Sequence, residues 1–183
     1  MEINMVYVFL ADGFEEIEAL GTVDILRRSE LDVKTVSITD SNEVCGAHGI
    51  KVLADIKTSD VDESNLDAIV LPGGLPGADN LENCKFVTDL VTKAARSGKI
   101  IAAICAAPKV LGVLGLLDGV KATCYPGFEA RLFSARVSKK RLVCDKNFIT
   151  AKGAGVTHEF AKAIAQALKK GVLAKRAING MFY

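Results

Sequence analysis

The sequence lacks an excess of charge of either sign, and it lacks a long apolar run. Its 23 basic residues face 22 acidic ones, which leaves a formal net charge of +1. A chain without a basic excess has no electrostatic footprint for nucleic acid, so we expect no nucleic-acid partner. No stretch of about 18 uncharged apolar residues occurs, so we expect no membrane-spanning helix and no membrane partner.

Closely spaced cysteine pairs are also missing, as is a basic start. The five cysteines form no C-x-x-C pair, which argues against a zinc site and a disulfide framework. The first residues lack the basic region of a signal peptide. We therefore expect a cytoplasmic protein in which most cysteines are small buried residues. The cysteines are Cys45, Cys84, Cys105, Cys124 and Cys144.

Short apolar runs alternate with helical stretches, and no repeat or linker interrupts them. This pattern predicts a single domain over residues 1–183 of the α/β class, with a mostly parallel sheet and helices on both faces. The expected strands are 5–11, 33–38, 68–71, 100–104, 121–124, 141–145 and 148–150. The expected helices are 14–29, 83–97, 108–114, 157–169 and 171–178, and residues 40–54 are expected to form a hairpin or an excursion.

Ligands of such sheets bind beyond the carboxyl ends of the strands. Three turns predicted at this edge carry unusual residues, namely 12–18, 72–77 and 105–108. We expect a site where these turns meet.

Cys105 follows the apolar strand and precedes a helix, with alanines two positions before and after it. Small neighbours at these positions are what a nucleophile elbow requires, because its strand-to-helix turn is sharp. At the start of a helix, unpaired N–H groups are expected to lower the pKa of the thiol. The alternative is an ordinary core cysteine among alanines, and the pattern alone leaves both open.

Two other turns offer partners for such a thiol. The Pro72–Gly77 turn is glycine-rich, so the N–H of Gly74 and that of Ala106 are candidates for an oxyanion hole. A plain Gly-Pro turn is the alternative. Glu18 is flanked by apolar residues, which predicts a raised pKa and a role as general acid and base. Acids early in a helix also stabilise its dipole without any catalytic role.

The sequence indicates neither a metal nor a nucleotide cofactor. No cluster has metal-ligand spacing, and the glycine-rich turn is not followed by the Lys-Ser or Lys-Thr of a Walker loop. Histidine is scarce: His48 and His158 are the two present, and neither is beside Cys105 in the sequence. A Cys–His pair through space stays open.

Four segments together resemble the ThiJ/PfpI superfamily, closest to the branch of the Parkinson-disease protein. They are residues 11–18, 71–74, 103–106 and 152–155, in order along nearly the whole chain. The resemblance implies a flavodoxin-like three-layer sandwich and a homodimer. It also implies that Cys105 is an oxidisable nucleophile, that Glu18 hydrogen-bonds it, and that the amides of Gly74 and Ala106 form an anion pocket.

The sequence departs from the family pattern at two positions. Protease-like members carry histidine directly after the cysteine, where this chain has Ala106, so we expect no peptidase activity. The Parkinson-protein branch often has a histidine near the cysteine, and Tyr125 stands there instead. A phenol with a pKa of about 10 is a poor base near neutrality, so Tyr125 is at most an accessory residue.

Two hypotheses of function use the same residues. One is a cofactor-independent hydrolase or lyase of glyoxalase or deglycase type, acting on a small α-oxoaldehyde or a glycated protein. The other is a non-enzymatic oxidative-stress sensor or redox-regulated chaperone. A homodimer is expected with both, because apolar residues surround the first helix more widely than one buried stripe requires. These residues are Phe14, Ile17, Leu20, Val23, Ile25 and Leu26.

Overall fold

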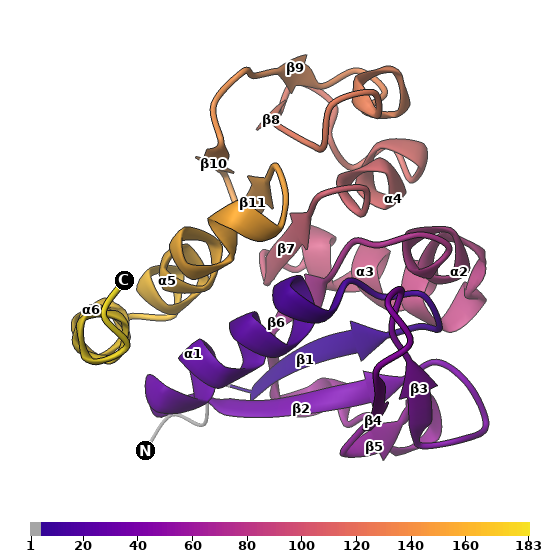
Figure 1. Cartoon of the computed structure of the whole chain (residues 1–183). Coiled ribbons are helices and arrows are strands. Elements are labelled where there is room, and N and C mark those ends of the chain that lie inside the picture. The colour runs from indigo at the N-terminus through magenta and orange to yellow at the C-terminus, as the bar shows by residue number, and fades with distance from the viewer. Residues whose placement is uncertain (1–4) are drawn as a thin grey trace.

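The computed structural model describes residues 5–183 and is built on a seven-stranded sheet (Figure 1). The strand order is β10-β11-β7-β6-β1-β2-β5, and every neighbouring pair is parallel except β10 with β11. Its strands are β1 (Met5–Leu10), β2 (Asp32–Ser37), β5 (Ile56–Lys57), β6 (Leu66–Leu71), β7 (Ile100–Ile104), β10 (Leu142–Asp145) and β11 (Phe148–Ala151).

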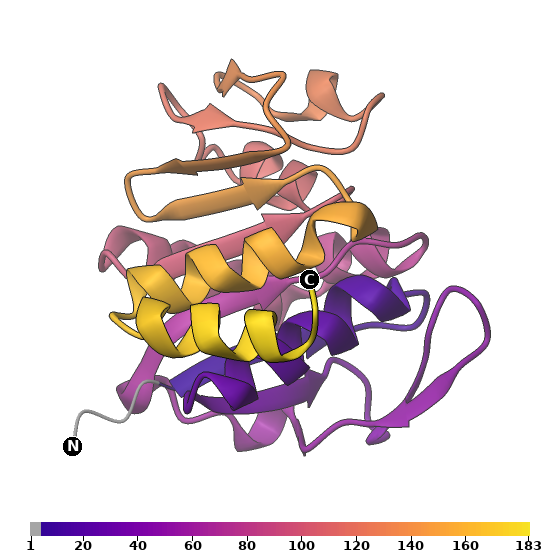
Figure 2. The ribbon, with the colours of Figure 1, turned by 60° about the vertical axis from the view of Figure 1, so that its left-hand side comes forward.

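Helices cover both faces of this sheet, as expected. Along β1, Val6 and Val8 belong to the core shared with α1, α5 and α6, whereas Tyr7 and Phe9 belong to the core shared with α2, α3 and α4. Figure 2 shows α5 and α6 side by side in front of the sheet. The result is the flavodoxin-like three-layer sandwich. The helices are α1 (Thr22–Arg28), α2 (Gly77–Asn83), α3 (Lys85–Arg96), α4 (Pro108–Val113), α5 (Thr157–Ala167) and α6 (Gly171–Gly180).

Two expected helices are wrong in detail. The helix expected over 14–29 begins as a π-helical turn, η1 (Ile17–Gly21), and continues as α1. The helix expected over 83–97 is the second of two, because α2 already begins at Gly77. Pro76, which the sequence predicts in a turn, directly precedes α2, and proline is tolerated at the start of a helix. Both differences lie at the sheet edge where the three unusual turns were predicted.

Short elements complete the fold. Residues 40–54 contain a two-stranded hairpin, β3 (Glu43–Cys45) and β4 (Lys51–Leu53), as expected. The strand expected over 121–124 is β8 (Lys121–Ala122), which pairs with β9 (Arg136–Val137) outside the main sheet. No helix within residues 5–183 is both long and apolar enough to cross a membrane. The remaining turns of 3₁₀ helix are η2 (Thr58–Asp60), η3 (Glu63–Asn65), η4 (Glu129–Arg131) and η5 (Ala154–Val156).

Candidate active site

The three turns meet at the carboxyl ends of β1, β6 and β7. The N–H of Glu15 donates to the carbonyl of Gly73 at 2.9 Å, and the N–H of Gly77 donates to the carbonyl of Gly13 at 3.2 Å. These bonds fix the turn after β1 against the turn after β6. Cys105, which directly follows β7, lies against the same glycine turn.

Cys105 has a left-handed backbone, with a φ of 64°. A side chain other than glycine is strained in this region, and such strain is typical of a nucleophile elbow. Two hydrogen bonds hold the turn: the Cys105 N–H donates to the carbonyl of Ala151 at 2.9 Å, and the Tyr125 N–H donates to the carbonyl of Cys105 at 2.8 Å. The half-buried thiol is therefore presented by β7, β11 and the segment after β8 together.

Two backbone N–H groups act on the thiol of Cys105. They belong to Gly74 and Ala106, and both lower the pKa of the thiol. Gly74 has a φ of 88°, and a Cβ atom there would collide with the backbone of Gly13 and Glu15. Glycine is therefore required at the position that turns one of the two N–H groups toward the sulfur.

Glu18 lies in the π-helical turn and is buried, with 1% of its surface exposed. The Gly73 N–H donates to its Oε2 at 2.8 Å, and the same oxygen lies beside Cys105, because a Cβ at Gly73 would be 2.7 Å from Oε2 and 2.5 Å from Cβ of Cys105. Burial raises the pKa of Glu18 to about 7, against a lowering contribution from the Gly73 N–H. The raised pKa agrees with the sequence-based expectation, and it gives a carboxyl group that exchanges a proton near neutrality.

The expectation of a lowered pKa for Cys105 is wrong. Burial raises the pKa of this thiol to about 12, and the charge of Glu18 adds to the increase. The N–H groups of Gly74 and Ala106 act in the opposite direction but are outweighed. The sequence pattern could not reveal this, because the partner carboxyl comes from a distant segment. A thiol in this setting needs a base, and Glu18 is in contact with it.

Tyr125 borders the site without a visible base function. Its ring is half-exposed and lies next to Gly153, where a Cβ would be 3.4 Å from ring atom Cδ2 and 3.8 Å from Oε1 of Glu18. Its backbone is more closely involved than its phenol, because its N–H holds the carbonyl of Cys105.

Sequence reasoning missed a group of three polar residues beside the site. Glu15, Glu16 and His48 have potential metal-ligating atoms within 4.8 Å of one another. Glu16 accepts from the N–H of His48 at 2.7 Å, and its other oxygen lies 2.7 Å from Nδ1 of the same histidine. Glu15 accepts from the N–H of Glu18 at 2.7 Å. These bonds hold the β3–β4 hairpin on η1 and account for the group without a metal.

The DJ-1/PfpI family model matches residues 4–167. The chain belongs to the DJ-1/PfpI family. The resemblance inferred from the four sequence segments is thereby confirmed, and the sandwich fold with it.

Relatives within the DJ-1/PfpI family cover most of this chain. Protein DJ-1 homolog B of Arabidopsis thaliana is 41% identical over 165 residues, which is 89% of this chain and 38% of that protein. The chain therefore spans about two fifths of the length of this relative. A Caenorhabditis elegans protein named glutathione-independent glyoxalase DJR-1.2 is 32% identical over 85% of this chain and 83% of its own length.

A solved structure of a family member agrees closely with the fold. Oxidized DJ-1 of Toxoplasma gondii superposes with a TM-score of 0.93 at 34% identity, covering 98% of each chain. The family to which this chain belongs thus includes a protein named as a glyoxalase.

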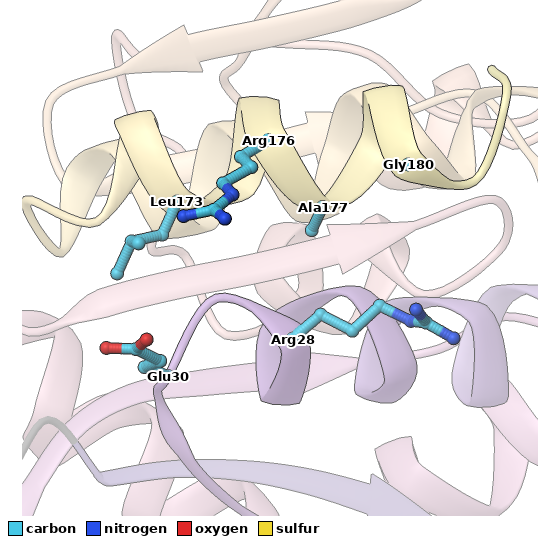
Figure 3. A pocket seen from close by; sticks show the side chains of 6 residues that line it. All are labelled: Arg28, Glu30, Leu173, Arg176, Ala177 and Gly180. Carbon is cyan, nitrogen blue, oxygen red and sulfur yellow. The ribbon is translucent and has the colours of Figure 1, made fainter.

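A surface pocket far from Cys105 in the sequence is the other hollow to consider on this DJ-1/PfpI chain. It has a volume of about 470 Å³ and lies between α6 and the end of α1 (Figure 3). The side chains of Arg28 and Arg176 point away from each other there, and Arg28 forms an ion pair with Asp24 at 2.8 Å. Because its polar groups do not converge, this hollow does not compete with Cys105 as the candidate site. Its lining is Arg28, Glu30, Leu173, Arg176, Ala177 and Gly180.

Proposed function

We propose that the chain is a cysteine-dependent enzyme of glyoxalase or deglycase type that acts on α-oxoaldehydes or their protein adducts without a cofactor. One observation carries the proposal. The buried carboxyl of Glu18 lies beside Cys105 at the Gly73 turn, and the N–H groups of Gly74 and Ala106 act on the same thiol by lowering its pKa. A nucleophile, a proton carrier and two donors for an anion are thus assembled at one point.

The chemistry with methylglyoxal needs no other group. Glu18 takes the thiol proton as the sulfur of Cys105 attacks the aldehyde carbon, and returning that proton to the oxygen gives a hemithioacetal. The N–H groups of Gly74 and Ala106 stabilise negative charge on the oxygen during attack. Moving the proton of this carbon to the neighbouring carbonyl carbon, and its hydroxyl proton to the oxygen of that neighbour, gives an isomeric thioester. Water hydrolyses the thioester to lactate and the free thiol, so the sum is addition of one water.

A second function uses the same pocket. The two N–H groups on the sulfur also suit a sulfinate, and protonated Glu18 would donate to it. This favours an oxidative-stress sensor or redox-regulated chaperone as the alternative. Peptidase activity is not proposed, because Ala106 stands where protease-like members carry histidine.

The decisive experiment measures lactate formed from methylglyoxal. We expect the wild-type chain to form many equivalents of lactate per molecule, and Cys105→Ala none above the uncatalysed background. Counting lactate separates catalysis from simple capture of the aldehyde by thiols. Cys144→Ala is the matched control, because it removes an exposed cysteine on edge strand β10. Equal lactate from wild type and Cys105→Ala would leave the sensor or chaperone as the better proposal.

We further propose that the chain is a homodimer, although the first helix supports this less than expected. Val23, Ile25 and Leu26 are buried within the chain, in the core shared with α5 and α6. Ile17 and Ile50 stay exposed, and the hairpin that carries Ile50 is bonded to η1. An apolar face next to the site is what a second copy would cover.

Light scattering of a charged variant tests the dimer. We expect wild type at twice the 19.4 kDa chain mass, and Ile50→Glu at the mass of one chain. Ile50 is 53% exposed between β3 and β4, so the change removes little surface that is buried within one chain. Val172→Glu places the same charge on α6, where the apolar side chain is 85% exposed, and should leave the dimer intact. Wild type at the single-chain mass would contradict the proposal.

A further inference from the structure

A buried lysine lies one helical turn after Cys105. Lys109 is in α4, and its side chain is 3% exposed. Its ammonium forms ion pairs with Asp79 and, at 3.6 Å, with Glu82, and lies 5.9 Å from the centre of the Phe128 ring. Removing a charge from water is costly, so these partners are what keep the lysine in the interior.

The partners of Lys109 come from two other segments around the thiol. Asp79 and Glu82 are in α2, which begins soon after Gly74. Phe128 follows Tyr125, to whose carbonyl its N–H donates at 3.2 Å. One ammonium group therefore joins the segments that follow Gly74, Cys105 and Tyr125.

Two further contacts join these segments directly, without involving Lys109. Arg131 donates to Glu82 at 2.7 Å, which links η4 to α2. The backbone of α4 at Gly112 lies so close to the Arg131 carbonyl that a Cβ there would collide with it. The helices α2 and α4 and the turn η4 thus form one unit with Lys109 at its centre.

We infer that Lys109 is a positioning residue, which holds α2 against α4 and so fixes the two N–H groups of Gly74 and Ala106 on the sulfur of Cys105. This inference rests on the proposed role of those N–H groups. Stability alone does not call for a lysine, because apolar side chains of similar volume stabilise a core at least as well as a buried ion pair. An ion pair adds geometric constraint, since Lys109 must meet acids on a different helix.

Lys109→Met tests the inference by the rate of Cys105 alkylation. Losing one N–H bond to a charged group costs about 1.4 kcal/mol, which is one pKa unit, so we expect alkylation by iodoacetamide at pH 8 to slow about tenfold. A mere loosening of the structure would expose the thiol and accelerate alkylation. Peptide mapping assigns the label to Cys105 among the five cysteines. We also expect kcat with methylglyoxal to fall about tenfold while KM changes little.

Lys99→Met is the matched control. Lys99 pairs with Asp67 at 3.1 Å, at the end of β7 opposite to Cys105, so alkylation should keep its wild-type rate. If Lys109→Met does not fold, Asp79→Asn removes an ion-pair partner that is 52% exposed and should slow alkylation in the same direction. An unchanged or faster alkylation in these variants overturns the inference. If Lys109→Met slows alkylation but the wild-type chain forms no lactate, the positioning role of Lys109 is upheld and the glyoxalase proposal is rejected.

Discussion

Replacing Gly73 with alanine is expected to reduce lactate formation from methylglyoxal by about 100-fold or more. A Cβ at Gly73 would lie 2.5 Å from Cβ of Cys105 and 2.7 Å from Oε2 of Glu18. Both side chains must shift to make room, and they cannot do so without separating the sulfur from the carboxyl group. Displacing reacting groups by about 1 Å commonly costs this much in rate.

The fold should survive the Gly73 change, because overpacking a core by one methyl costs about 1–3 kcal/mol. Circular dichroism and a thermal melt would check this before kinetics are read. Gly180→Ala is the control, since the same methyl there meets no atom within 4 Å. A Gly73→Ala chain that forms lactate at the wild-type rate would refute the proposed pairing of Cys105 with Glu18.

Glu18→Gln is expected to make the protein more stable at pH 8 while removing its turnover. The folded chain raises the pKa of Glu18 from 4.5 to about 7, so the folded state holds this proton more tightly than the unfolded state. The associated stability is complete below pH 4.5 and is lost as the pH rises to about 7, by about 3 kcal/mol. Glutamine does not titrate, and its carbonyl oxygen still accepts from Gly73.

Urea unfolding at two pH values measures this effect. The free energy of unfolding of Glu18→Gln minus that of wild type should be about 3 kcal/mol larger at pH 8 than at pH 4. Glu159→Gln makes the same carboxyl-to-amide change on α5 and is measured alongside as the control. An identical difference at both pH values for Glu18→Gln would show that ionisation of the buried carboxyl does not lower the stability of the fold. The expected result makes Glu18 a residue kept for chemistry at the expense of stability.

The sequence predicted most of the fold and the members of the candidate site. Apolar runs such as residues 100–104 are buried on both faces, so their pattern identifies strand β7 directly. Cys105, Glu18 and the glycine turn could be grouped because carboxyl ends of parallel strands share one edge. Turn residues at this edge hence identify a candidate site even before contacts are known.

What the sequence could not predict depends on contacts between distant residues. The pKa of Cys105 is raised because burial and Glu18 outweigh two N–H groups, and burial of a single thiol has no local signal. The π-helical turn at residues 17–21 has the same composition as an ordinary helix. In the sequence Lys109 resembles a surface lysine, because its acidic partners lie in a different helix, α2.

The hydrogen bond from Cys105 to Ala151 constrains the order in which the site can form. Strand β11 is synthesised long after the cysteine, and it must insert beside β7 before the elbow has its full set of backbone bonds. Parallel pairing of this kind brings together segments that are far apart in the chain, and it closes late in folding. A nascent chain on the ribosome therefore carries Cys105 without its full set of backbone bonds, and the elbow is complete only after β11 has emerged.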